Sequence, residues 1–216
     1  MKADLWLRSI AGRSTHLWDQ GDRPTCVVVA TSVAHGTART SPMTYAPDAL
    51  WLHAVKAAAA SDAGTTLSAA GAALADWGQP PVADWPYELP FTSVDPPLAA
   101  GTPPWDTAEM RAVPATVDNL VTAVSLGAVP VIVINVHESF YLDLGGDRLE
   151  TLDAGEAFYG RHAVCVVAHA VVDGDEWFVI QNSWGPDWGV GGYALASRAY
   201  LEATLQELAT VDASSA

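Results

Sequence analysis

Two stretches in the last third of the chain decide its fold: GRHAV at residues 160–164 and QNSWG at residues 181–185. The first places His162 at the start of a predicted strand, and the second places Asn182 twenty residues later (182 − 162). Far upstream, Cys26 precedes the histidine by 136 residues (162 − 26) and the asparagine by 156 residues (182 − 26). The three positions bring together a thiol, an imidazole and a carboxamide.

A cysteine nucleophile needs several partners, which makes this combination informative. The thiol needs a helix N-terminus or a neighbouring imidazolium to ionise. The base needs a third group that orients it, and the oxyanion formed by attack needs preset donors. Each residue alone has a plainer interpretation. Cys26 by itself predicts a small buried side chain, the valines at 27–29 favour a strand by propensity, and a lone histidine at a strand start is usually structural.

The surrounding residues favour the catalytic interpretation. WG at 188–189 and GGY at 191–193 follow QNSWG, and QG at 20–21 begins six residues before Cys26 (26 − 20). Together they resemble the papain-like (C1 family) cysteine peptidases, in which His and Asn follow the nucleophile by roughly 130–150 residues. The resemblance runs from about residue 6 to residue 201 and is closest in texture to bacterial members without disulfides. Weaker family-like signals occur at residues 49–51, 63–67, 76–78, 85–87, 126–131 and 138–141.

The resemblance implies a role for each of four residues. Cys26 is expected to be the nucleophile at the start of a long helix, whose N-terminus would stabilise the thiolate. His162 is expected to be the base that later protonates the leaving amine. Asn182 would accept a hydrogen bond from the imidazole and fix its tautomer, and Gln20 would form the oxyanion hole with the Cys26 backbone N–H.

The rim of the expected site departs from the family pattern. PTCV at residues 24–27 stands where the family usually has GSCW, and Gly64-Thr65 stands where it has paired glycines. These changes remove no catalytic group, and one strand-like surface for an extended substrate is expected to remain. The two tryptophans after Asn182 would shield the His–Asn hydrogen bond from water. The substrate-binding residues implied are Gly64, Thr65, Arg161, Trp184 and Trp188.

Periodicity and turn chemistry predict an α+β chain that agrees with a papain-like fold. Helical spacing, capping residues and closing glycines predict helices at 47–60, 67–77 and 116–126. Apolar runs and an Asp-Gly turn at 173–174 predict strands at 129–136, 163–172, 177–182 and 193–196. Eight prolines between residues 78 and 106 predict a long surface connection instead. We expect one catalytic domain over 1–216, with a helical lobe at about 15–110, a β-rich, barrel-like lobe at about 111–205, and the cleft between them.

Composition excludes several classes of function. The net charge of −15 argues against nucleic acid and anionic lipid as partners. The longest apolar run, 129–136, is far short of the ~20 residues of a membrane helix. Two cysteines make neither a disulfide framework nor a four-cysteine zinc site, and Cys165, in an apolar strand, is expected in the core. The other histidines show no metal-ligand spacing, so no metal and no cofactor are expected.

These observations predict a cysteine peptidase that hydrolyses peptide or protein substrates through an acyl-enzyme. Two alternatives remain open: an acyl-transferase in which an amine resolves the intermediate, and a catalytically silent peptide-binding or regulatory module. The acidic excess is expected to solvate the surface or to select basic peptides near the cleft. A cytoplasmic location is expected, since the structural cysteines of secreted members are absent; a mature fragment of an exported protein is the alternative. The chain is expected to begin where mature members begin, without an inhibitory pro-segment, and its oligomeric state is open.

Overall fold

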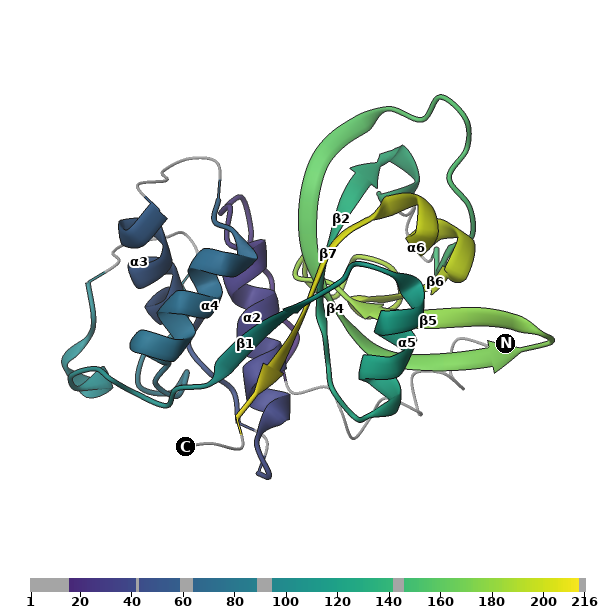
Figure 1. The fold of residues 1–216 in the computed structure, drawn as a ribbon. Helices are drawn as coiled ribbons and strands as arrows, with labels where there is room; N and C mark the ends of the chain where they lie inside the picture. The colour runs from purple at the N-terminus through teal and green to yellow at the C-terminus, as the bar shows by residue number, and fades with distance from the viewer. Residues whose placement is uncertain (1–15, 42, 59–63, 89–94, 142–145, 214–216) are drawn as a thin grey trace.

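The computed structural model describes residues 16–213 except residue 42 and the segments 59–63, 89–94 and 142–145. Three of the described helices occupy one half of the molecule, and a large sheet with two further helices occupies the other, as Figure 1 shows. The residues at 6–15, where the family resemblance begins, and the end of the helix predicted at 47–60 lie outside the described part.

The helical half is built around α2, which is Cys26–Ala38. It packs against α3 (Pro47–Ala58) and α4 (Leu67–Asp76) on one side and against the sheet on the other. The strand predicted after Cys26 from β-branched propensity is not found, because these residues form a helix. Every residue from Val27 to Gly36 is buried in the helix, and a helix that is apolar all round suits a position between two layers. Tertiary burial therefore outweighs the local preference of the valines.

The other half is one seven-stranded sheet in the order β1-β7-β2-β4-β5-β6-β3. All neighbouring strands pair antiparallel except β3 and β6. The Asp-Gly hairpin is confirmed, because Asp173 and Gly174 both have positive φ (54° and 94°) between β4 and β5. The strands are β1 (Glu109–Val113), β2 (Val131–His137), β3 (Arg148–Leu149), β4 (Phe158–Val172), β5 (Asp175–Gln181), β6 (Tyr193–Ser197) and β7 (Leu205–Asp212).

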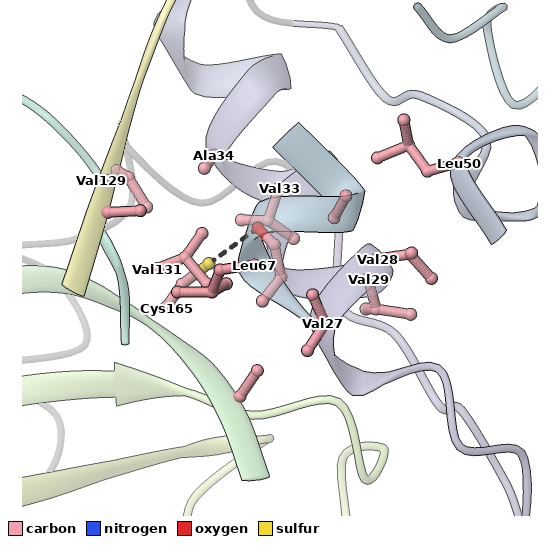
Figure 2. Packing of buried hydrophobic residues seen from close by; sticks show 14 of the residues in the cluster. Val27, Val28, Val29, Val33, Ala34, Leu50, Leu67, Val129, Val131 and Cys165 are labelled. Atoms are coloured by element: carbon pink, nitrogen blue, oxygen red, sulfur yellow. Dashed lines mark hydrogen bonds between the residues drawn. The ribbon is translucent and has the colours of Figure 1, made fainter. Parts of the chain in front are cut away.

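Helices cover both faces of the sheet. Alternate residues of β2 and β4 pack against α2, and the intervening ones pack against α5 (Val117–Ser125) and α6 (Arg198–Thr204). Figure 2 shows the α2 side, where valines of the helix meet Val131 and Cys165 of the sheet. The Cys165 thiol donates to the Ala30 carbonyl at 3.1 Å, which confirms it as a core residue.

The proline-rich connection crosses the helical half, as predicted. In its described parts Gln79 bridges to Asp106 through backbone hydrogen bonds, and Trp85 and Trp105 pack beside α3. Two short 3₁₀ turns, η1 (Leu98–Ala100) and η2 (Glu138–Phe140), complete the elements. The sheet continues past the expected lobe limit at residue 205, because β7 starts there and pairs with β1 and β2.

Candidate active site

Cys26 is the first residue of α2 and lines a cleft of about 420 Å³ between the two halves. Burial raises the pKa of its thiol, while hydrogen bonds from the backbone N–H groups of Ala163, Val27 and Cys26 itself act in the opposite direction. The positive end of the helix dipole also favours a thiolate here. The Ala163 contact places the nucleophile against the residue that follows His162.

His162 and Asn182 form the expected pair. His162 Nε2 lies 2.7 Å from Asn182 Oδ1. The Ser183 backbone N–H also donates to Oδ1, at 2.7 Å, which identifies that atom as the acceptor. The imidazole therefore carries its proton on Nε2, and Nδ1 is the nitrogen that can take another. Burial lowers the pKa of His162 to about 4, and the Asn182 hydrogen bond raises it in part.

Gln20 reaches the cleft because its chain segment pairs with the segment after Asn182. Gln20 N–H donates to the Ser183 carbonyl at 2.7 Å, and Gly185 N–H donates to the Trp18 carbonyl at 3.0 Å. The Gln20 side chain is held at both ends: Oε1 accepts from Ser183 Oγ at 2.5 Å, and Nε2 donates to the Arg23 carbonyl at 2.7 Å. The second Nε2 hydrogen remains available to an oxyanion beside the Cys26 N–H.

Aromatic rings surround the imidazole. The Trp184 ring lies 4.8 Å from that of His162 and 5.2 Å from both Phe140 and Tyr141. Trp188 is not among the described residues that line the cleft. The prediction that it contacts substrate is therefore wrong. It is buried behind Trp184, donates its indole N–H to the Phe140 carbonyl at 2.9 Å, and supports the ring layer.

The remaining predicted substrate residues all line the cleft: Gly64, Thr65, Arg161 and Trp184. Gly64 has φ +94°, and a Cβ there would stand 3.2 Å from the Pro24 carbonyl oxygen. A glycine is therefore needed for the backbone to pass the nucleophile loop this closely.

Three further cleft residues escaped the sequence reasoning: Tyr141, Tyr159 and Glu207. Glu207 lies on β7 opposite Val133 of β2, which lies opposite Ala163 of β4, so three neighbouring strands carry these positions across the cleft floor. Only this strand pairing brings Glu207 to the site, and no local motif marks it. Tyr141 lies in the stretch 138–141, which gave only a weak family-like signal, and Tyr159 directly precedes the stretch 160–164 without a signal of its own.

The part of the chain that the structure describes shows no candidate metal site. No group of three or more His, Cys, Asp or Glu side chains gathers there in a way that could hold a metal ion. Within the same residues, no helix combines the length and apolar character needed to cross a bilayer.

A helix-borne thiol that shares one cleft with a sheet-borne imidazole and its carboxamide is the arrangement expected of thiol-dependent acyl-transfer proteins. The family description "Papain family cysteine protease" matches residues 98–211, more than half of the 216 residues. The chain belongs to the papain family of cysteine proteases. His162 and Asn182 fall within the matched residues, whereas Cys26 and Gln20 lie outside them and rest on the geometry above.

Relatives and solved structures agree with this assignment. Cysteine proteinase 2 of Entamoeba histolytica is 38% identical over 74 residues, 34% of this chain and 24% of that protein. Mouse cathepsin J is 35% identical over 77 residues, 34% of this chain and 22% of that protein. The aligned part thus spans about a quarter of these relatives.

The fold is shared with solved cysteine proteases. Xylellain from Xylella fastidiosa superposes with a TM-score of 0.76 at 20% identity, covering 92% of this chain and 82% of that one. The Carica candamarcensis protease CMS1MS2 superposes with a TM-score of 0.73 at 18% identity, covering 96% of both chains. At this identity the similarity supports the papain fold alone. The xylellain match gives the expected bacterial texture partial support.

Proposed function

We propose that the chain is a cysteine peptidase that cleaves peptide bonds through an acyl-enzyme on Cys26. The observation that carries the proposal is the placement of the thiol at the start of α2, against the backbone N–H of Ala163, in a cleft that is also lined by His162, whose Nε2 is held by Asn182. That placement and the membership of the family support the catalytic roles proposed for these residues.

The reaction uses each group in turn. The Cys26 proton passes to His162 Nδ1 as sulfur attacks the substrate carbonyl carbon, and the carbonyl oxygen becomes an oxyanion. Gln20 Nε2–H and the Cys26 N–H would donate to it; one such donor contributes roughly 10²–10³-fold in kcat. The C–N bond then breaks, and the leaving amine takes the proton from His162. Water, deprotonated by the same imidazole, releases the acid from the thioester.

Charge in the cleft supports a preference within peptide substrates. Among the described residues that line it, Glu207 is the only acidic one, and the basic ones are Arg161 and the catalytic His162. Glu207 is half-buried on the cleft floor near Ala163, where its carboxylate would favour a cationic side chain on the acyl side of the scissile bond. Exclusion of nucleic acid and membrane partners and the cytoplasmic location stay predictions.

The test uses the two cysteines of the chain as a matched pair. Cys26→Ala should abolish turnover of a peptide library and labelling by an epoxide or fluoromethylketone probe. Cys165→Ala should retain both, because that thiol is buried in the core. Wild-type protein that neither labels nor cleaves would refute the proposal.

The two alternatives give different results in the same assay. Tight peptide binding without turnover, together with a thiol pKa near the ordinary value of about 8.5, would indicate a silent binding module. Mass spectrometry with an added amine separates the other case: amide products in place of acids would indicate an acyl-transferase.

A further inference from the structure

The loop between Gln20 and Cys26 carries both expected oxyanion donors, yet it has no regular backbone structure of its own. The only cysteines of the chain, Cys26 and Cys165, are both free, so no disulfide anchors the loop. Backbone hydrogen bonds hold it in part: Gln20 N–H donates to the Ser183 carbonyl, Arg23 N–H to the Gln20 carbonyl and Thr25 N–H to the Arg23 carbonyl. Side chains supply its remaining contacts.

A buried ion pair ties the middle of the loop to α3. The Arg23 guanidinium pairs with Asp48 through both carboxylate oxygens, and the side chains are only 10% and 4% exposed. Asp48 is in the first turn of α3, which packs on α2. Burial raises the pKa of Asp48 and the Arg23 guanidinium opposes that shift. The pair therefore fixes Arg23 to a rigid element.

Tyr87 ties the two ends of the same loop. Its ring lies under the Arg23 guanidinium, 4.3 Å from centroid to carbon. Its hydroxyl lies 2.7 Å from Thr25 Oγ1 and donates to the Gln20 carbonyl at 3.3 Å. Because Thr25 directly precedes Cys26, this one side chain connects the nucleophile end of the loop to the Gln20 end.

The Arg23 backbone links these contacts to the Gln20 side chain, because its carbonyl accepts the Gln20 Nε2–H at 2.7 Å. We propose that Arg23, Asp48 and Tyr87 are positioning residues that aim the Gln20 amide and the Cys26 backbone N–H at one point in the cleft. None of the three lines the cleft, so they act through Gln20 and Cys26. The inference rests on the proposed function, since it assigns the oxyanion donors of that reaction.

The helical half contains a matched control. Arg39, at the far end of α2, pairs with Asp106, which also accepts from the Tyr45 hydroxyl. This second set also joins an arginine–aspartate pair to a tyrosine, here through the tyrosine hydroxyl on the carboxylate, and its hydrogen bonds among the described residues do not reach the nucleophile loop. Asp106→Asn should therefore lower the melting temperature without affecting catalysis.

Asp48→Asn should lower kcat about tenfold and leave KM within about twofold of wild type. A displaced donor loses part of the roughly 10²–10³-fold increase in kcat that one oxyanion contact contributes. Alkylation of Cys26 by iodoacetamide should stay within about twofold, since that displacement forms no oxyanion. In a Gln20→Ala background Asp48→Asn should lose most of its effect on kcat and keep only the part that acts through the Cys26 N–H, as expected for residues that act through one another. Glu88 lies near Asp48, so Arg23→Met, which a second carboxylate cannot rescue, should repeat the result.

Tyr87→Phe is the gentler variant if the ion-pair variants fold poorly. It keeps the ring under Arg23 and removes only the hydroxyl bonds, so kcat should fall by about threefold, the equivalent of part of one net hydrogen bond. The proposal is overturned if Asp48→Asn and Asp106→Asn change kcat equally, or if Asp48→Asn has its full effect without Gln20.

A spectroscopic readout separates this proposal from the proposed function. The side-chain amide NMR signals of Gln20, assigned by their loss in Gln20→Ala, should shift in Asp48→Asn and not in Asp106→Asn. That shift is measurable even if the wild type cleaves no peptide, a result that would refute the peptidase proposal alone. Unchanged Gln20 signals in Asp48→Asn would refute the positioning role.

Discussion

The two halves of the molecule hold their parts of the site by different means. On the helical half, buried polar contacts from Asp48 and Tyr87 hold an irregular loop. On the sheet half, His162 is on β4, and rings of Phe140 and Trp184 pack around it. Strand pairing already fixes backbone position on the sheet, so the Asn182 hydrogen bond and apolar packing are enough to orient the imidazole there. A loop without a ladder needs directional bonds that specify one conformation.

The largest expected effect lies at the junction of the two halves. Gln20→Ala should lower kcat by roughly 10²–10³-fold with little change in KM, because it removes a donor used mainly in the transition state. Steady-state kinetics on a peptide substrate measures it. A rise in KM alone would show instead that Gln20 binds substrate.

Each half also contains a buried histidine, and both should make the protein acid-sensitive. Burial lowers the pKa of His35 and of His162 to about 4, below the ordinary value of 6.5. The unfolded chain therefore takes up protons first, and stability present above pH 6.5 is lost as pH falls towards 4. Between pH 7 and pH 5 each histidine should contribute about 2 kcal/mol to this loss.

Urea unfolding of wild type and His35→Phe at the two pH values tests this expectation. The variant keeps a ring to stack on Tyr45 and should show about half the pH-dependent loss. An identical loss in both proteins would place the acid sensitivity elsewhere.

A smaller effect is expected from the aromatic packing around His162. Trp184→Leu should admit water to the His162–Asn182 pair and lower kcat/KM by about tenfold, or roughly 1.4 kcal/mol. The acid limb of the pH profile, which belongs to the coupled Cys26–His162 pair, should move to higher pH because less burial lets the pKa of His162 rise. Trp177→Leu, on β5 beside Arg148, should leave the profile unchanged.

The smallest effect concerns selectivity. Glu207→Gln should reduce the preference for a basic side chain on the acyl side by about two- to fivefold, as expected for one partly solvated ion pair. Cleavage profiles of paired Lys and norleucine substrates measure the ratio. A ratio equal to that of wild type would remove Glu207 from substrate selection.

Much of the sheet half could be predicted from local signals. The strand periods, the Asp-Gly turn and the QNSWG stretch act over short distances, so β4, β5 and Asn182 occupy the expected places. Propensity was wrong for valines 27–29, because their conformation is set by burial between α3, α4 and the sheet.

The tethers and the cleft floor could not be predicted, for a related reason. Arg23 and Asp48 are 25 residues apart, and no spacing rule connects a loop arginine to the first turn of a later helix. Glu207 reaches the cleft only through the pairing of β7 with β2. Trp188 was expected beside the substrate because the family resemblance implied it, yet the turn after Trp184 places it in the layer behind.

Because Cys165 is buried, the number of reactive thiols per chain reports the fraction of folded protein. Burial raises the pKa of that thiol far above its usual range, and the side chain is closed off between α2 and the sheet. A thiol reagent meets only Cys26 in the folded protein and both cysteines once the core opens. One equivalent bound per chain would report an intact preparation, two would report unfolding, and intermediate values would give the unfolded fraction without any assay of catalysis.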